Sequence, residues 1–365
     1  MNNIAKLAKA IMKSKKLHRT PKIQIPTESL LSTGFTPLNV HCTGRTRGGF
    51  GKGLFIFLVG DSSSGKTWLS HTCLAEATIN EEFDGYDFYY DNIENGALMD
   101  LTKFFGQAVA DRLMPPKGDW DNPVNSRTSE DLYDNLHSKL TADRPCIYIV
   151  DSETALMPAD DLEKFIENKN LRAKGKKTKG NYGMAKAKTN SANLRVMIPL
   201  LEKSGSILIM ISQTRQNVAM FSFEDRTRAG GLSLRFYAHL ELWTKIIKKI
   251  KKEVKGKDRH VGTIVEIDVK KNRLSGWEGK LKMPFLKQTG IDNTGGCIDY
   301  LIEEGFWRES SKVINAKQME VKLKREELIQ HIEKEGIEPM LHSLVRKCFE
   351  QVQVACTFTR KMRYS

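Results

Sequence analysis

Three features are absent from this sequence of 365 residues, and each absence narrows the class of protein. No apolar run approaches the ~20 residues of a membrane-spanning helix, so we expect no transmembrane segment. The six cysteines lack C-x-x-C spacing, which argues against a disulfide framework or a zinc site and predicts reduced thiols. Residues 1–20 have neither the unbroken apolar core nor the clear cleavage site of a secretory signal. We therefore expect a cytoplasmic protein.

Charge is the most informative feature of the composition. Lys and Arg number 58 against 44 Asp and Glu, which gives a formal net charge of +14. This excess favours a polyanionic partner, nucleic acid first, although a basic surface without a partner would have the same composition. The hydrophobic content of 40% is enough for a substantial core. Repeated apolar strands and helices from 54 to 303 predict one α/β domain with a largely parallel sheet.

A phosphate-binding loop organises the chain. Residues 60–67 read G-D-S-S-S-G-K-T, between an apolar run over 54–59 and a helix expected over 68–77. In this context the pattern binds a nucleotide, because backbone N–H groups curl around the phosphates at the start of a helix. Lys66 is expected to contact the β- and γ-phosphates, and the Thr67 hydroxyl to bind Mg²⁺. The nucleotide-binding set is Gly60, Asp61, Ser62, Ser63, Ser64, Gly65, Lys66 and Thr67.

Two further strand-like runs end in carboxylates. Residues 86–90 are followed by Asp91 and Glu94, and residues 146–150 are followed by Asp151. Beside a phosphate-loop strand, one such carboxylate can polarise water toward the γ-phosphate and another can support Mg²⁺. We assign the first role to the 91–94 turn and the second to Asp151. Ordinary loop carboxylates would give the same local pattern.

Two basic segments with glycines predict contacts with DNA. The segment at 158–190 is expected to be mobile without a polyanion, and a solvated charged loop is the alternative. The segment at 214–230 follows a buried strand over 206–212 and combines Arg, Asn and aromatic residues before a glycine pair. A third basic stretch, 245–257, is expected at a hairpin tip. The candidate DNA-binding residues are Arg172, Lys174, Lys176, Lys177, Lys179, Arg215, Asn217, Arg226, Arg228, Gly230 and Gly231.

The ends of the chain differ from its centre. Residues 1–30 predict a basic amphipathic helix and a proline-containing linker that could dock on a neighbouring subunit, with a frayed terminus as the alternative. Residues 31–310 form the expected core. Residues 311–365 predict a small helical region, with two helices over 318–352 separated near Gly336 and Pro339.

The motifs, in this order, resemble the RecA/UvsX family of DNA recombinases over about 31–308. The matching segments are 31–34 (L-S-T-G) with 37–39 (P-L-N), 60–67, 209–215 (I-M-I-S-Q-T-R), 230–238 (G-G-L-S-L-R-F-Y-A) and 269–273 (V-K-K-N-R). The segment 289–296 (T-G-I-D-N-T-G-G) is most similar to the phage UvsX pattern. The resemblance implies a RecA-like P-loop ATPase core whose mainly parallel sheet is flanked by helices.

The resemblance also implies roles for individual residues. Glu94 would activate water, and Gln213 would sense the γ-phosphate and couple it to the DNA loop that follows. Lys271 and Arg273 would cross a filament interface to the neighbour's ATP, as arginine fingers do. Asp292, in the phage-like segment, is assigned to the nucleotide site.

Three aliphatic side chains in the two DNA loops are candidate wedges between bases, although ordinary packing is the alternative. They are Met184, Val218 and Met220. The sequence also departs from the family pattern, because Ile93 adds one residue between the strand and the catalytic carboxylate. We therefore favour Glu94 over Asp91 as the base. The basic end of the chain, in place of an acidic tail, puts tail-based autoinhibition in doubt.

As a whole, the resemblance implies a DNA-dependent ATPase that uses ATP and Mg²⁺. It would form a helical filament on single-stranded DNA, pair it with homologous duplex DNA and promote strand exchange. Further implied partners are a single-strand-binding protein and a loading mediator, and the implied location is the cytoplasm of a bacterium or a phage-infected host, at the nucleoid. A hexameric RecA-fold helicase and an ATP-switched recombination mediator remain as alternatives.

Overall fold

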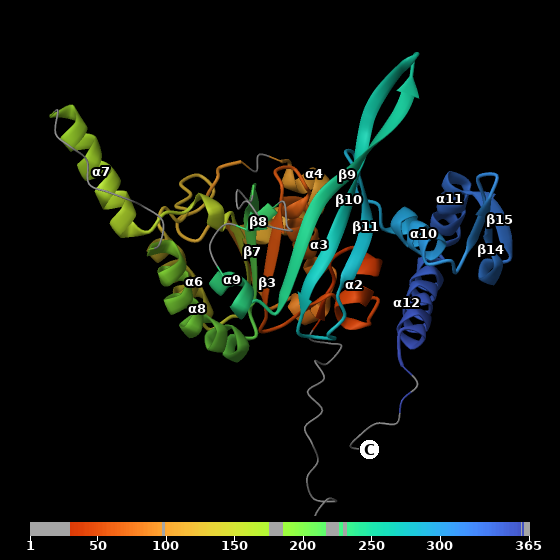
Figure 1. The fold of residues 1–365 in the computed structure, drawn as a ribbon, viewed down its shortest axis with the longest axis horizontal. Coiled ribbons are helices and arrows are strands. Elements are labelled where there is room, and N and C mark those ends of the chain that lie inside the picture. The colour runs from red at the N-terminus through yellow and green to blue at the C-terminus, as the bar shows by residue number, and fades with distance from the viewer. Residues whose placement is uncertain are drawn as a thin grey trace, which may run out of the picture.

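A mixed β-sheet runs through the centre of the molecule (Figure 1). The computed structural model describes residues 30–96, 99–174, 185–216, 226–228, 232–358 and 360, without the side chains of 215, 216 and 226–228. The strands of this sheet are β3 (Phe55–Gly60), β4 (Asp87–Asn92), β5 (Leu113–Met114), β6 (Cys146–Asp151), β7 (Ile207–Gln216), β8 (Arg226–Arg228), β9 (Leu240–Val254), β10 (Lys257–Asn272), β11 (Gly279–Leu286) and β12 (Gly290–Ile291).

The sheet has a parallel half and an antiparallel half. Its strand order is β12–β11–β10–β9–β3–β7–β6–β4–β5, and β8 pairs with β7 outside this path. Neighbouring strands from β9 to β5 are parallel, whereas β9 to β12 pair antiparallel. Parallel strands are buried on both faces, which explains why β3, β6 and the first part of β7 are apolar runs. The expected α/β architecture is confirmed.

Helices cover both faces of the sheet, and alternate side chains of β3 separate the two layers. Ile56 and Leu58 pack in the layer of α3 and α5, whereas Phe55, Phe57 and Val59 pack in the layer of α6, α8 and α9. The helices of the core are α2 (Thr36–Thr43), α3 (Lys66–Thr78), α4 (Leu101–Phe105), α5 (Gln107–Arg112), α6 (Ser129–Leu140), α7 (Ala159–Ala173), α8 (Ala185–Ser204) and α9 (Leu232–Tyr237). Two short strands, β1 (Leu30–Leu31) and β2 (Phe50–Gly51), pair beside this core.

The C-terminal part has its own hydrophobic cluster. It contains α10 (Asn293–Glu303), α11 (Arg325–Glu335), α12 (Glu338–Ala355) and a small antiparallel sheet of β13 (Arg308–Ser310), β14 (Val313–Ala316) and β15 (Val321–Lys324). The two helices expected here are confirmed, and Gly336 ends α11 in the left-handed conformation at φ 64°. The three strands were not predicted, because each spans only three or four residues.

Two elements extend away from the body (Figure 1). One is α7, which occupies the first half of the segment expected to be mobile. This helix was not predicted, because the many lysines of the segment obscured the helical i, i+3, i+4 spacing of Leu162, Phe165 and Ile166. The other is the outer part of the β9–β10 hairpin, at the basic stretch expected to form a hairpin tip. Among the described helices, none is long and apolar enough to span a membrane.

Candidate functional site

The phosphate loop connects the end of β3 to the start of α3. Gly65 precedes the helix with φ 83°, and α3 begins at Lys66, so the first-turn N–H groups point at the loop. At Gly60 a Cβ atom would overlap the side chain of Thr244 on the neighbouring strand β9, so only glycine fits there. Ser64 also contacts Thr244, with 2.6 Å between the two hydroxyl oxygens. The loop is therefore fixed by the strand beside it.

The ammonium group of Lys66 is held inside this loop. Its Nζ donates to the carbonyl oxygens of Gly60 at 2.9 Å and Asp61 at 2.6 Å. Burial lowers the pKa of Lys66 to about 8, against the opposing effects of Asp151 and Glu94. A buried cation bonded only to neutral carbonyl and hydroxyl oxygens would gain strongly from an anion, which is what a phosphate chain supplies.

Asp151, at the end of β6, accepts two hydrogen bonds on the same oxygen. Thr67 Oγ1 donates to Asp151 Oδ2 at 2.6 Å, and the Tyr90 hydroxyl donates to it at 3.0 Å. Burial raises the pKa of Asp151, while these two bonds lower it. A carboxylate and a hydroxyl beside a phosphate loop are the hard oxygen donors that Mg²⁺ prefers, so the residues present fit that ion.

Glu94 lies across the cavity from the phosphate loop. Gln213, on β7, donates from Nε2 to both Glu94 carboxylate oxygens at 2.9 and 3.1 Å, and the Ser152 hydroxyl also donates to Glu94. The cavity has a volume of about 320 Å³ and is lined by Ser62, Ser63, Lys66, Thr67, Asn92, Glu94, Gly96, Met99, Asp151, Ile211 and Gln213. One cavity thus brings together five predicted site residues from four separate segments of the sequence: Lys66, Thr67, Glu94, Asp151 and Gln213.

Asp91, the alternative base, is placed differently. Its side chain is 0% exposed and accepts hydrogen bonds from Ser126 N at 2.9 Å, Ser126 Oγ at 2.6 Å and the Tyr148 hydroxyl at 3.2 Å. Burial raises the pKa of Asp91, and these bonds oppose the rise. The Asp91 carboxylate therefore attaches α6 and the loop before it to the sheet, and it has no access to the cavity.

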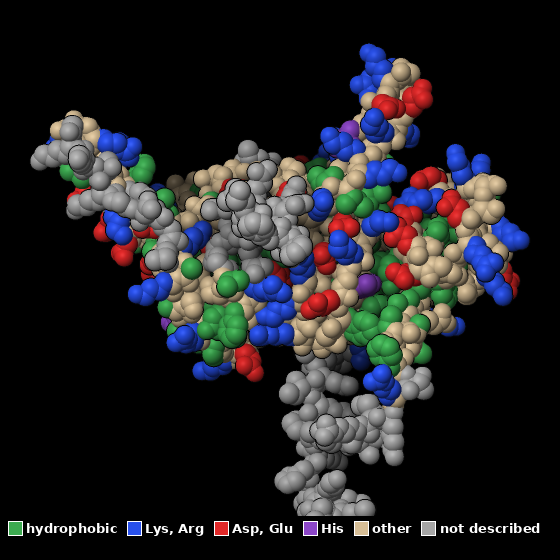
Figure 2. Space-filling view, in the orientation of Figure 1, with side chains coloured by type: hydrophobic (Ala, Val, Ile, Leu, Met, Phe, Trp, Pro, Cys, Tyr) green, Lys and Arg blue, Asp and Glu red, His purple; other side chains and the backbone are tan. Residues whose placement is uncertain are grey.

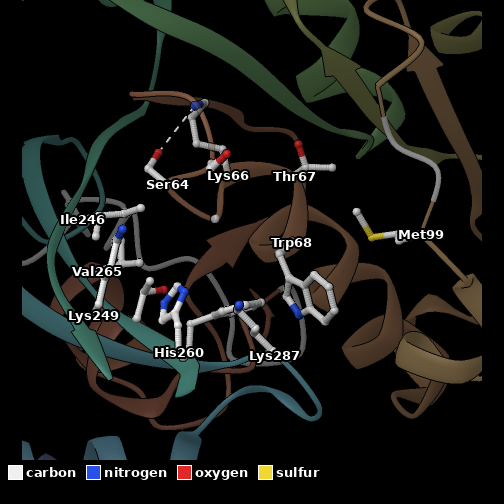
Figure 3. Close-up of a pocket in the computed structure, with 15 residues that line it drawn as sticks. Ser64, Lys66, Thr67, Trp68, Met99, Ile246, Lys249, His260, Val265 and Lys287 are labelled. Carbon is white, nitrogen blue, oxygen red and sulfur yellow. Dashed lines mark hydrogen bonds between the residues drawn. The ribbon is translucent and has the colours of Figure 1, made fainter. Parts of the chain in front are cut away.

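A second, larger cavity adjoins the helix end of the phosphate loop. Its volume is about 520 Å³, and its walls include Trp68 and Met99 (Figure 3). Phe285 also lines it. The rings of Trp68 and Phe285 meet edge to face with 4.8 Å between their centroids. Lys249, His260 and Lys287 also reach this cavity. These residues were not predicted, because Phe285 is more than 200 positions from the loop and no local motif contains it.

Lys271 and Arg273 lie at the opposite end of β10 and line neither cavity. Lys271 Nζ donates to the carbonyl oxygens of Arg235 and Phe236 at 2.5 and 2.9 Å, and Arg273 donates to the Phe236 carbonyl at 2.9 Å. Burial and the neighbouring Arg273 charge lower the pKa of Lys271 to about 8. Two crowded cations bonded to helix-end carbonyls therefore lie at the surface, away from the chain's own phosphate loop.

The structure does not bring Asp292 to the nucleotide cavities. Its carboxylate caps α10 by accepting from Gly295 N at 2.8 Å, and it pairs with Arg325 at 3.3 Å. Arg325 also binds Asp299 at 2.7 Å, so this network attaches α11 to α10. We therefore correct the assignment of Asp292 from nucleotide contact to helix capping and packing of the C-terminal part.

The expected DNA-binding residues are described only in part. Arg172 lies near the end of α7 and donates to the Asn168 carbonyl at 3.3 Å, and Lys174 follows the helix. The backbones of Arg215, Arg226 and Arg228 belong to the β7–β8 hairpin, which begins directly after Gln213. The candidates outside the described residues are Lys176, Lys177, Lys179, Met184, Asn217, Val218, Met220, Gly230 and Gly231.

Comparison with known proteins gives one consistent result. The RecA N-terminal domain matches residues 5–292. Protein RecA of Streptomyces venezuelae is 25% identical over 307 residues, covering 84% of this chain and 72% of its own length. Protein RecA of Nocardia farcinica is 27% identical over 282 residues (77% and 72%), and that of Cytophaga hutchinsonii is 26% identical over 261 residues (71% and 65%). The phosphate loop and the mainly parallel sheet agree with this match. The chain therefore belongs to the RecA family.

Proposed function

We propose that this protein is a DNA-dependent ATPase that forms a helical filament on single-stranded DNA and promotes homologous pairing and strand exchange. The observation that carries the proposal is the contact between Glu94 and Gln213, because Gln213 directly precedes the β7–β8 hairpin expected to bind DNA. A change at the γ-phosphate would alter this contact and move the hairpin. Family membership supports a role in recombination and repair.

Five polar residues of the smaller cavity have distinct tasks in hydrolysis. Lys66 would leave the loop carbonyls and bind the β- and γ-phosphates, while Thr67 and Asp151 would hold Mg²⁺. Bound Mg²⁺ would neutralise charge on the phosphates. Glu94 would accept a proton from the attacking water as the bond from the γ-phosphorus to ADP breaks, and Gln213 and Ser152 would orient the Glu94 carboxylate.

The larger cavity suits the nucleobase of ATP. It continues from Gly65 and Thr67, which would lie beside the phosphates, and its walls of Trp68, Met99 and Phe285 are apolar. A flat base buries much apolar area in such a space and can stack against or meet the edges of aromatic rings.

Self-assembly would complete the site. Lys271 and Arg273 donate to the backbone carbonyl of Phe236 in α9. The side chains of Phe236 and Leu232 in this helix are 65% and 76% exposed. Exposed apolar side chains next to uncompensated cations are the composition expected of a surface that meets a second subunit and its nucleotide. The two cations would then stabilise negative charge at the neighbour's γ-phosphate.

We also propose, on the resemblance of segment 289–296, that the chain belongs to the phage UvsX-type subgroup. For domain organisation we propose an N-terminal docking segment over 1–30, an ATPase core over 31–310 and a C-terminal region over 311–365. The C-terminal hydrophobic cluster supports a distinct C-terminal region that packs on the core, because the cluster also includes α10 and Val40 of α2.

The test combines two measurements on the purified full chain. ATP hydrolysis with and without single-stranded DNA, and joint-molecule formation between single-stranded and homologous supercoiled DNA, should both be positive. Electron microscopy with a non-hydrolysable ATP analogue should show helical filaments. Closed rings would favour a helicase, and filaments or DNA binding without hydrolysis or pairing would favour a mediator; either result overturns the proposal.

A further inference from the structure

A buried carboxylate lies beside the two cations of the proposed assembly surface. Glu241, in β9, is 0% exposed, and the strand register places it opposite Lys271 of β10. Glu241 lines neither nucleotide cavity. Because an ionised carboxylate is costly to bury without compensating partners, the partners of Glu241 indicate its role.

Glu241 joins α9 to the central sheet. Its Oε2 lies 3.2 Å from Nε of Arg235, near the end of α9, and its Oε1 accepts a hydrogen bond from Nε1 of Trp243 at 3.0 Å. Trp243 is two residues further along β9, so this bond fixes the direction of the carboxylate within the strand. The other carboxylate oxygen therefore faces Arg235 and holds the end of α9 against β9.

The end of α9 in turn holds both cations. Lys271 Nζ donates to the backbone carbonyl of Arg235 at 2.5 Å, and both Lys271 and Arg273 donate to that of Phe236 at 2.9 Å. A continuous series of contacts thus runs from Glu241 through Arg235 to Lys271. Figure 2 shows Lys and Arg side chains next to hydrophobic side chains in the region of α9, so this series ends at a surface that is both basic and apolar.

Glu241 is also the counter-charge of this cluster. Among the described residues, the charged groups that act on Lys271 are Arg273, Glu241 and Arg235, of which Glu241 is the one anion. Burial and the charges of Arg273 and Lys271 lower the pKa of the nearby His239 to about 4, so His239 is neutral at pH 7. Burial and Arg273 lower the pKa of Lys271 to about 8, while Glu241 opposes the fall. Without the Glu241 charge, the pKa of Lys271 would lie closer to neutral.

We propose that Glu241 is a positioning residue for hydrolysis in the filament, which holds Lys271 and Arg273 in the orientation that reaches a neighbouring subunit's nucleotide. Glu241 itself touches no reacting atom, because it is enclosed behind Arg235 and Trp243. Its charge also favours the protonated form of Lys271. This inference rests on the proposed function, in which the two cations stabilise charge at the neighbour's γ-phosphate.

A purely structural role for Glu241 would give a different result. A carboxylate that only fastened α9 to the sheet would stabilise the fold, and its replacement would leave the pH dependence of hydrolysis unchanged. A carboxylate that also supports the charge of a lysine whose pKa is about 8 must change that pH dependence when it is replaced. The pH profile of kcat therefore separates the two roles.

The experiment compares Glu241→Gln with Glu266→Gln. Glutamine keeps the size of the side chain, and its oxygen can still accept from Trp243. The matched control removes a carboxylate of β10 whose ion-pair partner is Lys280, at 3.2 Å. Hydrolysis of ATP by filaments on single-stranded DNA is measured over a range of pH at saturating Mg²⁺, together with the thermal unfolding of each variant.

In Glu241→Gln, kcat should fall about 10–100-fold, because small displacements of groups that stabilise a transition state cost this much. KM for ATP should change little, since the chain's own nucleotide cavities are intact. The alkaline limb of the kcat profile should move to lower pH, because Lys271 must be protonated and loses its proton more readily without Glu241. The control should keep the wild-type kcat and alkaline limb.

Two further variants test the sign of the charge effect. Adding Lys271→Arg to Glu241→Gln should abolish the shift of the alkaline limb, because a guanidinium stays charged. Arg235→Gln removes a cation that lowers the pKa of Lys271, so its alkaline limb should move to higher pH while kcat falls through lost positioning. The Arg235 side chain is 48% exposed, so this variant tests the proposal even where Glu241→Gln does not fold.

A wild-type kcat and alkaline limb in Glu241→Gln overturn the inference. A lower melting temperature without a shift of the limb overturns it as well, and leaves Glu241 as a packing residue. If Glu241→Gln does not fold, a limb in Arg235→Gln that stays in place or moves to lower pH has the same consequence. A wild-type protein without DNA-stimulated hydrolysis or filaments instead overturns the proposed function.

Discussion

At the scale of single residues, the positions of two carboxylates distinguish the proposed catalytic base from its alternative. Glu94 faces the phosphate-loop cavity, whereas Asp91 is enclosed by Ser126 and Tyr148. We expect Glu94→Gln to lower the ATP hydrolysis rate by about 10²–10⁴-fold with nucleotide binding retained, because only proton acceptance is removed. Asp91→Asn should lower thermal stability and leave most of the rate. The assignment is reversed if Asp91→Asn costs more in kcat than Glu94→Gln.

Tyr90 is a positioning residue for the carboxylate that would hold Mg²⁺. Burial and the neighbouring Asp151 raise the pKa of Tyr90, so its hydroxyl remains a hydrogen-bond donor to Asp151. We expect Tyr90→Phe to raise the Mg²⁺ concentration for half-maximal ATPase activity about 10–100-fold, as loss of an outer hydrogen bond to a metal ligand does. Tyr148→Phe is the matched control, since its buried hydroxyl donates to Asp91 instead. Equal Mg²⁺ dependence in the two variants would refute the role.

Lys66 is expected to make nucleotide binding sensitive to pH. Burial lowers the pKa of Lys66 to about 8 in the free protein, and a bound phosphate would raise it. Affinity should therefore be constant at neutral pH and fall as the pH rises through about 8, where the free protein loses the proton. Titration of a fluorescent nucleotide at several pH values measures this, and Lys66→Arg, whose guanidinium stays charged, should show no such fall. A wild-type profile that is flat past about pH 9 contradicts it.

At the scale of elements, tight packing around α10 leaves no room for a side chain at Gly296. A Cβ atom at Gly296 would overlap the ring of Phe35, which is fully buried. Alanine favours a helix over glycine by about 1 kcal/mol, yet we expect Gly296→Ala to destabilise the fold by about 1–3 kcal/mol through overpacking. Thermal unfolding measures this against Gly85→Ala, whose added Cβ meets no atom within 4 Å. Equal melting temperatures in the two variants would disprove the steric explanation.

The helices and strands were predictable where apolar residues form runs or recur with helical spacing. The core strands β3, β6 and β7 and the helices α6 and α8 follow directly from apolar runs and periodicity. Among the features that did not follow are α7, the C-terminal sheet and the helix break at Gly106, where φ is 91°. In each case the local signal was short or was outweighed by charge.

The site residues likewise divide into those that a local motif predicts and those that only the structure reveals. Residues 60–67 and Asp151 carry motifs that a single segment reveals. The choice between Asp91 and Glu94 depends on how deeply each carboxylate is buried at the end of β4. The one-residue insertion makes this impossible to predict from the sequence. Trp68, Tyr90 and Phe285 contribute through contacts between distant segments, and Asp292 was misplaced because its motif gave no information about its side-chain partners.

At the scale of the whole molecule, one exposed aromatic side chain is expected to govern assembly. Phe236 is 65% exposed next to Lys271 and Arg273. Phe236→Ala should shorten filaments and raise the protein concentration at which they form, because buried aromatic anchors dominate interface energy. Electron microscopy and light scattering measure this. Phe358→Ala, which removes an 81% exposed ring elsewhere, is the control, and identical filament lengths in both variants would argue against this surface.

Because Lys271 lies away from the chain's own phosphate loop, the number of complete sites would depend on the length of the filament. In the proposed filament, each subunit would give its two cations to the site of the next subunit, so the subunit at one end would lack a donor. A filament of n subunits would then hold n − 1 complete sites, and hydrolysis per subunit would rise as (n − 1)/n and be zero for a lone chain. Short DNA oligomers that seat two, three or four subunits would reveal this as a stepwise series of specific activities.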